Sequence, residues 1–447
     1  MKTEIRTFAH ENGAIQKVQV VKLDCWEELS FFTPAYSQEA FERFCDIYRE
    51  QLLPKFPYLF SEIVMFCLSE DVDLPETWYD RKYGTITDRN IMANLILREG
   101  VSFKNGQPSF KLFAAEKLWQ QLEKNNCVQV LKGKGRYKQV ITVSRNIGML
   151  STDKESSPVR FNTSFFLFDP IDVFNPYDVM GEPYGLLVSN GSIERTPLYD
   201  RDCLLVDENN NVEIKKIGLK DLTIEINGIS YKPGEDVIIY ERPRYGKAPE
   251  TSGKQYAVSG NRIIAIKDGG ETTVPLAGFV MEFKEEPDLK GNERVNYKGL
   301  ENIKFGIQCA NAAVKEGKIV TEFTSAFYNL KKLNRVPYPP CTYPMNYRKD
   351  RAARMVIGAD KENKPMVIWL EGAGKFGYTE GKDSCGATLL DVAKLCKQCG
   401  MENGINIDGG GSAQILVNNK RELKISDRKP IDNSEVERPV PVGLCVK

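Results

Sequence analysis

The middle of the chain is a succession of short β-like segments, and this pattern constrains the fold more than any other feature. Glycine, asparagine, aspartate and proline separate the segments, as at Asn190-Gly191 and Asn227-Gly228, and these residues favour tight turns. We therefore expect an α+β class with an irregular, many-stranded mixed β core and few helices. The predicted strands are Val128–Leu131, Gln139–Val143, Gly185–Val188, Cys203–Val206, Leu222–Ile226, Asp236–Tyr240, Arg262–Ile266 and Gly278–Phe283.

The C-terminal third adds strands and one helix. A helix is predicted from Thr388 to Lys397, because Thr388 with Asp391 forms a capping-box pattern and Gly400 is a typical stop. The predicted strands form two hairpins and one further strand: Met355–Ala359 with Met366–Leu370, Ile415–Val417 with Glu422–Ile425, and Gly404–Ile407.

The first third is predicted to be mostly helical. Ser37 can cap a helix that ends by Pro54, and further helical patterns cover 59–68, 87–98 and 110–125. We expect two parts, a mostly helical N-terminal region at 1–127 and a larger domain at 128–447. The β-like stretch 16–24 would belong to the core if the helices are an insertion. No role and no protein partner of the region 1–127 can be named from the sequence.

The chain of 447 residues contains one histidine, His10. A Ser-His-Asp triad, a Cys-His pair or a zinc site with several histidines is therefore nearly excluded. Acid–base chemistry would fall to Asp, Glu, Lys, Tyr or Cys side chains.

The charge balance and the apolar pattern limit the classes of partner and the cellular locations to be expected. Lys plus Arg and Asp plus Glu are each 61, so the formal net charge is zero and a general attraction to nucleic acid is not expected. No apolar run approaches the roughly 18 residues of a membrane span, and Met1 to Asn12 lacks the apolar region of a signal peptide. If the chain is full length, a cytoplasmic location is expected; if it is trimmed, a secreted or lumenal one.

The most specific local motif is Asp408-Gly409-Gly410-Gly411-Ser412. A strand of apolar residues ends in a carboxylate, and the three glycines allow close approach of the backbone to a ligand. Their N–H groups could form a concave site for a phosphate or a developing oxyanion. The alternative interpretation is a tight turn that the aspartate closes.

Several segments together resemble the phosphodiester glycosidase family. The clearest similarity runs from Arg354 to the end of the chain. Its segments are Arg354–Gly358, Val367–Gly372, Gly386–Ala393, Asn406–Ser412 and Glu437–Val440. Similarity in character extends upstream through Val159–Phe166, Tyr184–Gly191, Val274–Val280 and Gly306–Lys318. The resemblance thus covers roughly 128–447 and implies a phosphodiester-glycosidase-like catalytic domain there.

The resemblance implies a hydrolase that cleaves the glycosidic bond of a sugar-1-phosphodiester, on a small molecule or a glycan. The products would be a phosphomonoester and a free sugar, with N-acetylglucosamine as the candidate. Asp408 or Glu371 would activate water or stabilise the reacting sugar carbon. The phosphate would be bound by two arginines and the glycine loop, and the sugar hydroxyls by two polar side chains: Arg354, Arg438, Gly409, Gly410, Gly411, Asn162 and Ser412.

No cofactor is predicted, and a divalent metal at Asp408 is left open because no Asp/Glu cluster demands one. Two departures from the family pattern affect the pocket. Thr163 and Ser164 stand where the family has two glycines, and Gln308-Cys309-Ala310 replaces a Gly-Gly-Pro. Two other functions therefore stay open: a non-catalytic protein that binds carbohydrate or anionic glycan, and the same site adapted to a different transfer reaction.

Overall fold

The structure is a computed structural model. It describes residues 1–10, 13–53, 64–65, 68, 72–132, 138–143, 147–153, 157–168, 173, 175–241, 246–322, 350–373, 379–429 and 431–447. Within these residues no helix is long and apolar enough to cross a membrane.

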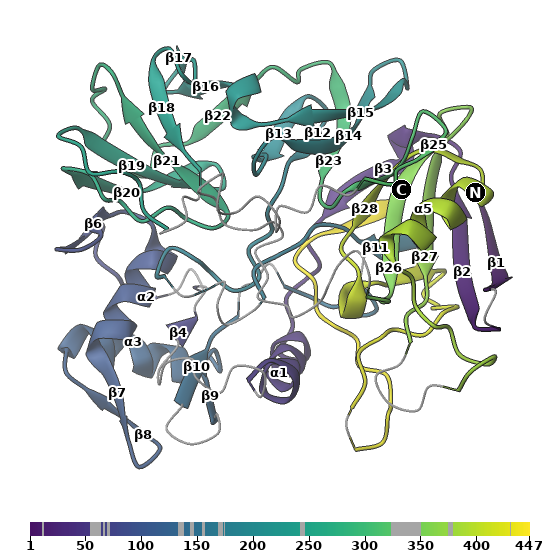
Figure 1. The fold of residues 1–447 in the computed structure, drawn as a ribbon. Coiled ribbons are helices and arrows are strands. Elements are labelled where there is room, and N and C mark those ends of the chain that lie inside the picture. The colour runs from purple at the N-terminus through teal and green to yellow at the C-terminus, as the bar shows by residue number, and fades with distance from the viewer. Residues whose placement is uncertain are drawn as a thin grey trace.

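An antiparallel sheet of seven strands organises the C-terminal half. In spatial order it consists of β1 (Lys2–Ala9), β2 (Ile15–Lys22), β27 (Pro365–Leu370), β26 (Arg354–Asp360), β28 (Met401–Ile407), β24 (Ala312–Lys315) and β25 (Lys318–Ile319). Every residue of β27 is buried, as expected for an aliphatic strand covered on both faces. Helix α5 (Leu389–Gln398) covers one face (Figure 1).

A four-stranded antiparallel sheet packs on the opposite face of the seven-stranded sheet. Its order is β29 (Ile415–Val417), β11 (Val159–Asn162), β30 (Gly443–Val446) and β3 (Leu29–Phe32). Phe161 and Leu444 from this sheet share an apolar core with Ile357, Trp369 and Ile407 from the larger one. Residues 408–414 connect β28 to β29, so the Asp408 loop passes from one sheet to the other.

The remaining strands build smaller sheets. One sheet has the order β13 (Ser192–Arg195), β12 (Leu187–Ser189), β23 (Ile303–Gln308), β14 (Arg201–Asp207) and β15 (Val212–Ile217). A second has the order β18 (Val237–Tyr240), β21 (Gly278–Phe283), β19 (Lys254–Ser259), β20 (Arg262–Asp268), β6 (Gly84–Ile86) and β5 (Trp78–Asp80). A three-stranded sheet has the order β17 (Ile229–Tyr231), β16 (Thr223–Ile226) and β22 (Val295–Lys298). Another has the order β4 (Val64–Met65), β10 (Lys138–Ile141) and β9 (Gln129–Lys132), and β7 (Val101–Lys104) pairs with β8 (Gln107–Phe110).

The predicted β-rich core with few helices is confirmed, and each of the eight strands expected between 128 and 283 corresponds to an observed strand. The helix after Thr388 is also confirmed, since Thr388 Oγ1 accepts a hydrogen bond from the Asp391 N–H and Asp391 in turn accepts from the Thr388 N–H. The strand predicted at Glu422–Ile425 is wrong. Residues 421–427 form no strand and pass instead as a loop beside the candidate site.

The prediction that residues 1–127 are mostly helical is wrong. Among the described residues of this region, three α-helices form, α1 (Gln38–Ile47), α2 (Arg89–Gly100) and α3 (Phe113–Lys124), but strands β1 to β8 lie between and around them. Of the helix predicted at 59–68, only residues 64, 65 and 68 are described, and Val64–Met65 form strand β4, so the prediction is wrong there. Figure 1 shows α2 and α3 beside β7 to β10, on the side of the molecule away from α5.

Strands from the first third pair with strands from distant parts of the chain. Strand β2 pairs with β27, β3 with β30, and β6 with β20. A helix or strand that depends on such pairing is stabilised by contacts remote in sequence. The division after residue 127 therefore remains a prediction.

Candidate functional site

Three neighbouring strands bring Glu371, Arg354 and Asp408 to one edge of the seven-stranded sheet. Strand β26 lies between β27 and β28 and is antiparallel to both. Arg354 begins β26, while Glu371 follows the last residue of β27 and Asp408 follows the last residue of β28. Strands in a sheet lie about 4.8 Å apart. Two candidate carboxylates and one candidate arginine thus start from adjacent positions.

Two glycines allow the chain segments at this edge to approach closely. A Cβ at Gly372 would lie 2.6 Å from the Ala353 nitrogen, and a Cβ at Gly409 would lie 2.7 Å from the Ala353 carbonyl oxygen. That carbonyl accepts a 2.8 Å hydrogen bond from the Gly410 N–H. The residues after both candidate carboxylates are therefore packed against the residue before Arg354.

Asp408 is half-buried directly after the end of β28. Burial raises its pKa to about 7, against the lowering effects of a hydrogen bond from Ser412, the charge of Arg438 and the Gly409 N–H. The Asp427 carboxylate acts in the raising direction. A carboxyl group with a pKa near neutrality can exchange protons under physiological conditions, which is typical of acid–base groups in active sites.

A buried ion pair holds Arg438 beside Ser412. Arg438 Nε and Nη2 donate to the two carboxylate oxygens of Asp427 at 2.9 and 3.1 Å, and both residues are buried. Arg438 Nη1 lies 3.4 Å from Ser412 Oγ, and the guanidinium carbon lies 4.4 Å from the centre of the Phe168 ring. The two-point contact with Asp427 fixes the plane of the guanidinium group.

Gly411 leaves the space that this ion pair needs. A Cβ at Gly411 would lie 2.3 Å from Arg438 Nη2 and 2.3 Å from each Asp427 carboxylate oxygen. The third glycine of the loop is thus required by close packing.

The substitution Gly411→Ala should destabilise the protein by about 1–3 kcal/mol, because the added methyl group must displace a buried ion pair. Chemical denaturation of the variant measures this. Gly253→Ala is the matched control, since its Cβ would meet only the end of the Glu282 side chain at 3.1 Å. Equal stability of the two variants would contradict the packing assigned to Gly411.

Asn162 ties the Asp408 loop at both ends. Its Nδ2 donates to the Asp408 carbonyl oxygen at 2.7 Å, and its Oδ1 accepts from the Gln414 N–H at 3.0 Å. The residue is 1% exposed. The structure thus gives Asn162 a positioning contact with the loop, whereas the sequence predicted contact with sugar hydroxyls. Ser412, predicted for the same hydroxyls, is fully buried between Asp408 and Arg438.

The peptide N–H groups of the loop bond mainly within the protein. The Gly410 N–H donates to Ala353, and the Ser412 N–H donates to the Gly409 carbonyl in the 3₁₀ turn Gly410–Ser412. The Gly409 N–H acts on the Asp408 carboxylate. These three groups are therefore engaged, and positive charge for a phosphate must come chiefly from arginine side chains.

Glu371 and Arg354 are each held by defined partners. The two Glu371 carboxylate oxygens accept from the Lys424 N–H at 3.0 Å and from Ser384 Oγ at 2.8 Å. Arg354 Nε and Nη2 donate to the carbonyls of Ala387 and Asp350, both at 3.1 Å. The site therefore contains a cluster around Asp408 and Arg438, with Glu371 and Arg354 on the two strand ends beside it.

Asp427 is the residue of the candidate site that the sequence did not reveal. It stands in Asp427-Arg428-Lys429, a charged run of the kind usually found in a solvated turn. Only the folded chain shows that it is buried and paired with Arg438. An indirect signal was the third glycine of the loop, Gly411, whose missing side chain makes room for the pair.

The positions that depart from the family pattern are filled with buried side chains. Thr163 Oγ1 donates to the Val442 carbonyl at 3.1 Å, and the Thr163 carbonyl accepts from the Asp408 N–H at 2.8 Å. Ser164 is 3% exposed, and its Oγ has no hydrogen-bond partner among the described residues. Gln308 accepts from the Leu198 N–H and donates to the carbonyls of Tyr199 and Ile217, which is a structural role.

No group of three or more His, Cys, Asp or Glu side chains that could hold a metal ion occurs in the described part of the chain. The charged groups acting on Asp408 are the Arg438 guanidinium and the Asp427 carboxylate. A divalent metal at Asp408 stays open, and metal analysis of the purified protein would test it.

The geometry can be set beside known proteins. No curated protein matches the chain. A hypothetical protein from Synechocystis is 13% identical with a TM-score of 0.42, over 99% of this chain and 61% of that one, so the present chain spans less than two thirds of its length. The catalytic domain of zebrafish N-acetylglucosamine-1-phosphodiester alpha-N-acetylglucosaminidase, described as auto-inhibited by its pro-peptide, is 14% identical with a TM-score of 0.34, over 71% of this chain and 81% of that one.

The sequence profile described as phosphodiester glycosidase matches residues 223–447, just over half of the chain. The matched segment contains Arg354, Glu371, the Asp408–Ser412 loop, Asp427 and Arg438. These are the residues that the strand ends and the buried ion pair gather at one edge of the sheet. The chain belongs to the phosphodiester glycosidase family.

Proposed function

We propose that the protein hydrolyses the glycosidic bond of a sugar-1-phosphodiester. Water would attack the anomeric carbon, and the phosphoryl group would leave as a phosphomonoester together with a free sugar. N-acetylglucosamine is the first sugar to test, on the strength of the family. The observation that carries the proposal is the half-buried carboxyl of Asp408, whose pKa is raised by desolvation to about 7, beside the fixed guanidinium of Arg438.

The leaving group explains why a site without histidine suffices. A phosphate monoester is a stable anion whose second pKa is about 6, so its departure needs little protonation. Cations that attract the phosphate in the ground state and in the transition state are needed instead. Arg438 supplies one cation, and Arg354 at the start of β26 supplies the second.

Asp408 is assigned the role of accepting a proton from the attacking water. Its ionised form is disfavoured by burial and so binds a proton readily. Glu371, whose two oxygens each accept a hydrogen bond, is held as a carboxylate acceptor and is assigned to stabilise positive charge at the sugar. Asn162 and Asp427 are positioning residues, since they hold the loop and Arg438 respectively.

The experiment is direct product analysis. Purified protein is incubated with N-acetylglucosamine-1-phosphate esters of several alcohols, and free reducing sugar and phosphomonoester are quantified. Equal amounts of both products support the proposal. Tight binding of the esters without turnover would favour a non-catalytic glycan-binding protein, and transfer of the sugar to an added acceptor would favour an adapted transfer reaction.

The rate should depend on pH through Asp408. If the ionised carboxylate accepts the proton, kcat/KM rises with pH, levels off above about pH 7 and is roughly a tenth of its plateau one unit below the pKa. A profile of kcat/KM between pH 5 and 9 measures this. A rate that falls as the pH rises through 7 would show that the protonated form is required, and would reassign Asp408 as the acid.

A further inference from the structure

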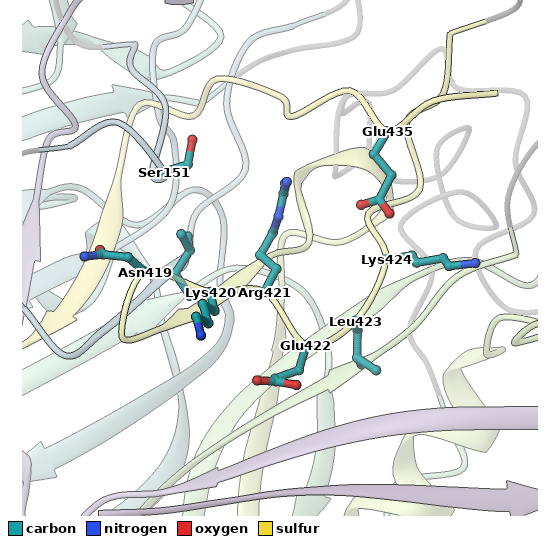
Figure 2. Close-up of a pocket in the computed structure, with 9 residues that line it drawn as sticks. Ser151, Asn419, Lys420, Arg421, Glu422, Leu423, Lys424 and Glu435 are labelled. Atoms are coloured by element: carbon teal, nitrogen blue, oxygen red, sulfur yellow. The ribbon is translucent and has the colours of Figure 1, made fainter. Parts of the chain in front are cut away.

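An open polar groove of about 550 Å³ lies next to the candidate site. Its walls come mainly from the loop that follows β29, which includes the segment Glu422–Ile425 that was predicted as a strand. Figure 2 shows the Arg421 side chain extending between Ser151 and Glu435, while Lys424 points away from Ser151. The lining residues are Ser151, Leu416, Asn419, Lys420, Arg421, Glu422, Leu423, Lys424 and Glu435.

Two contacts connect the groove to the candidate catalytic residues. The N–H of Lys424 donates to the Glu371 carboxylate at 3.0 Å. Arg421 Nη1 lies 3.6 Å from the carboxylate of Glu437, the residue directly before Arg438. A molecule in the groove would therefore contact the same loop that positions Glu371. It would also lie near Glu437, which directly precedes Arg438 in the chain.

Arg421 has hydrogen-bonding capacity to spare. Its Nη1 is buried yet has no hydrogen-bond partner in the described structure, because the 3.6 Å separation from Glu437 is too long for a hydrogen bond. Leaving a charged donor without a hydrogen bond is unfavourable. The Arg421 side chain as a whole is 26% exposed and lines the groove, so a ligand there can reach it and supply an acceptor.

The nearby carboxylates are already compensated. Glu437 accepts from the Ser151 N–H at 2.9 Å. Glu435 accepts from the Ile425 N–H at 3.2 Å and lies 3.5 Å from Arg428. The lining has three cations, Lys420, Arg421 and Lys424, against two carboxylates, Glu422 and Glu435. Lys424 Nζ also lies 3.9 Å from the Asp383 carboxylate. The lining thus offers more positive than negative charge to a ligand.

We propose that this groove binds an anionic group, a phosphate or a carboxylate, carried by the alcohol part of the phosphodiester substrate, and that Arg421 is its main contact. The inference rests on the proposed function. It predicts that the protein selects phosphodiesters whose alcohol part has an additional negative charge. Arg421 contributes through substrate binding and takes no part in the bond cleavage.

The test compares three substrates of similar size, in which N-acetylglucosamine-1-phosphate is esterified to glycerol, to glycerate or to glycerol phosphate. The protein should prefer the two anionic esters by about tenfold in kcat/KM, mainly through KM, as expected for one charge-assisted hydrogen-bonded contact. A preference for only one of them identifies the group as carboxylate or phosphate. In Arg421→Gln the preference should fall to less than twofold, and Arg421→Lys should retain part of it.

Lys361→Gln is the matched control, because Lys361 is an exposed cation in the turn between β26 and β27 and should change neither the rates nor the preference. An equal kcat/KM for the charged and uncharged esters in the unaltered protein would overturn the inference, as would a preference that survives Arg421→Gln. Thermal melting shows whether each variant folds. If Arg421→Gln does not fold, the test rests on Arg421→Lys. An undiminished preference for the anionic esters in Arg421→Lys would overturn the role assigned to the guanidinium group.

The groove can also be tested if no ester is hydrolysed, which would refute the proposed function alone. Titration calorimetry with glycerate, glycerol phosphate and glycerol would then show binding of an anion but not of glycerol. That binding should be at least fivefold weaker in Arg421→Lys. Equal binding of all three probes, or none, would overturn the groove as an anion site.

Discussion

Asp408→Asn should lower kcat by about a thousandfold while the protein stays folded. The amide has the shape of the carboxyl group but cannot take a proton from water, and general acid–base groups typically contribute 10²- to 10⁴-fold, with about 10³ as the middle of that range. Because burial disfavours the ionised carboxylate, removing its charge should leave the melting temperature equal or slightly higher. Sugar release at pH 8 and thermal melting measure the two effects.

Asp268→Asn is the matched control for this prediction. Asp268 likewise lies at the end of a strand, β20, and precedes a glycine pair, but it is exposed and lies in another sheet. The control should keep full activity. Sugar release by the Asp408→Asn protein at more than about a tenth of the unaltered rate would remove Asp408 from the chemistry.

Asp427→Ala should cost about 3–5 kcal/mol of folding stability, because it leaves the buried guanidinium of Arg438 without its counter-ion. The free energy of unfolding in urea measures this loss. Activity should fall as well, since Arg438 would no longer be held against Ser412.

A double variant separates the cost of the unpaired charge from other effects. Replacing both partners, as in Asp427→Leu with Arg438→Met, should recover part of the lost stability, because no charge is then left buried alone. It should not recover activity. A loss of less than about 1 kcal/mol in Asp427→Ala would mean that solvent reaches Arg438 and that the pair is not buried as described.

The sequence predicted those parts of the fold that depend on neighbouring residues. The capping box at Thr388 and the turn-forming residues between the strands are local signals, and they located α5 and the eight central strands correctly. The first third was misjudged because several of its strands are short and depend on pairing with remote segments. Strands β5 and β6 have three residues each, and β6 is held by pairing with β20, about 180 positions away in the chain.

Edge strands were hidden for a different reason. Strand β1 has a mixed polar composition, since it lies at the border of the seven-stranded sheet and none of its residues is buried. A sequence of this kind has no apolar run to mark it. Likewise, Glu422–Ile425 alternates in the manner of a strand, yet it is drawn into a loop, where the Lys424 N–H binds Glu371 and the Ile425 N–H binds Glu435.

The sequence predicted which residues carry the candidate site but not the contacts that hold them in place. Asp408, Glu371, Arg354 and Arg438 could be named because they belong to segments that resemble the family. The sequence could not show which partner each of these side chains and N–H groups would bind. The Asn162 amide is not exposed to a ligand but donates a hydrogen bond to the loop. The N–H groups of Gly410 and Ser412 donate to carbonyl groups of the protein. Asp427 could be found only from the fold, because its partner Arg438 is eleven positions away across a loop.

The central claim is that the protein breaks the bond between the sugar carbon and the phosphate oxygen. Hydrolysis of N-acetylglucosamine-1-phosphoglycerol in water enriched in ¹⁸O, followed by mass spectrometry of both products, tests it most directly. Attack at the anomeric carbon predicts that ¹⁸O is found in the released sugar and that the phosphomonoester carries none. Label in the phosphomonoester and none in the sugar would contradict the account, because it would show attack at phosphorus by a phosphodiesterase.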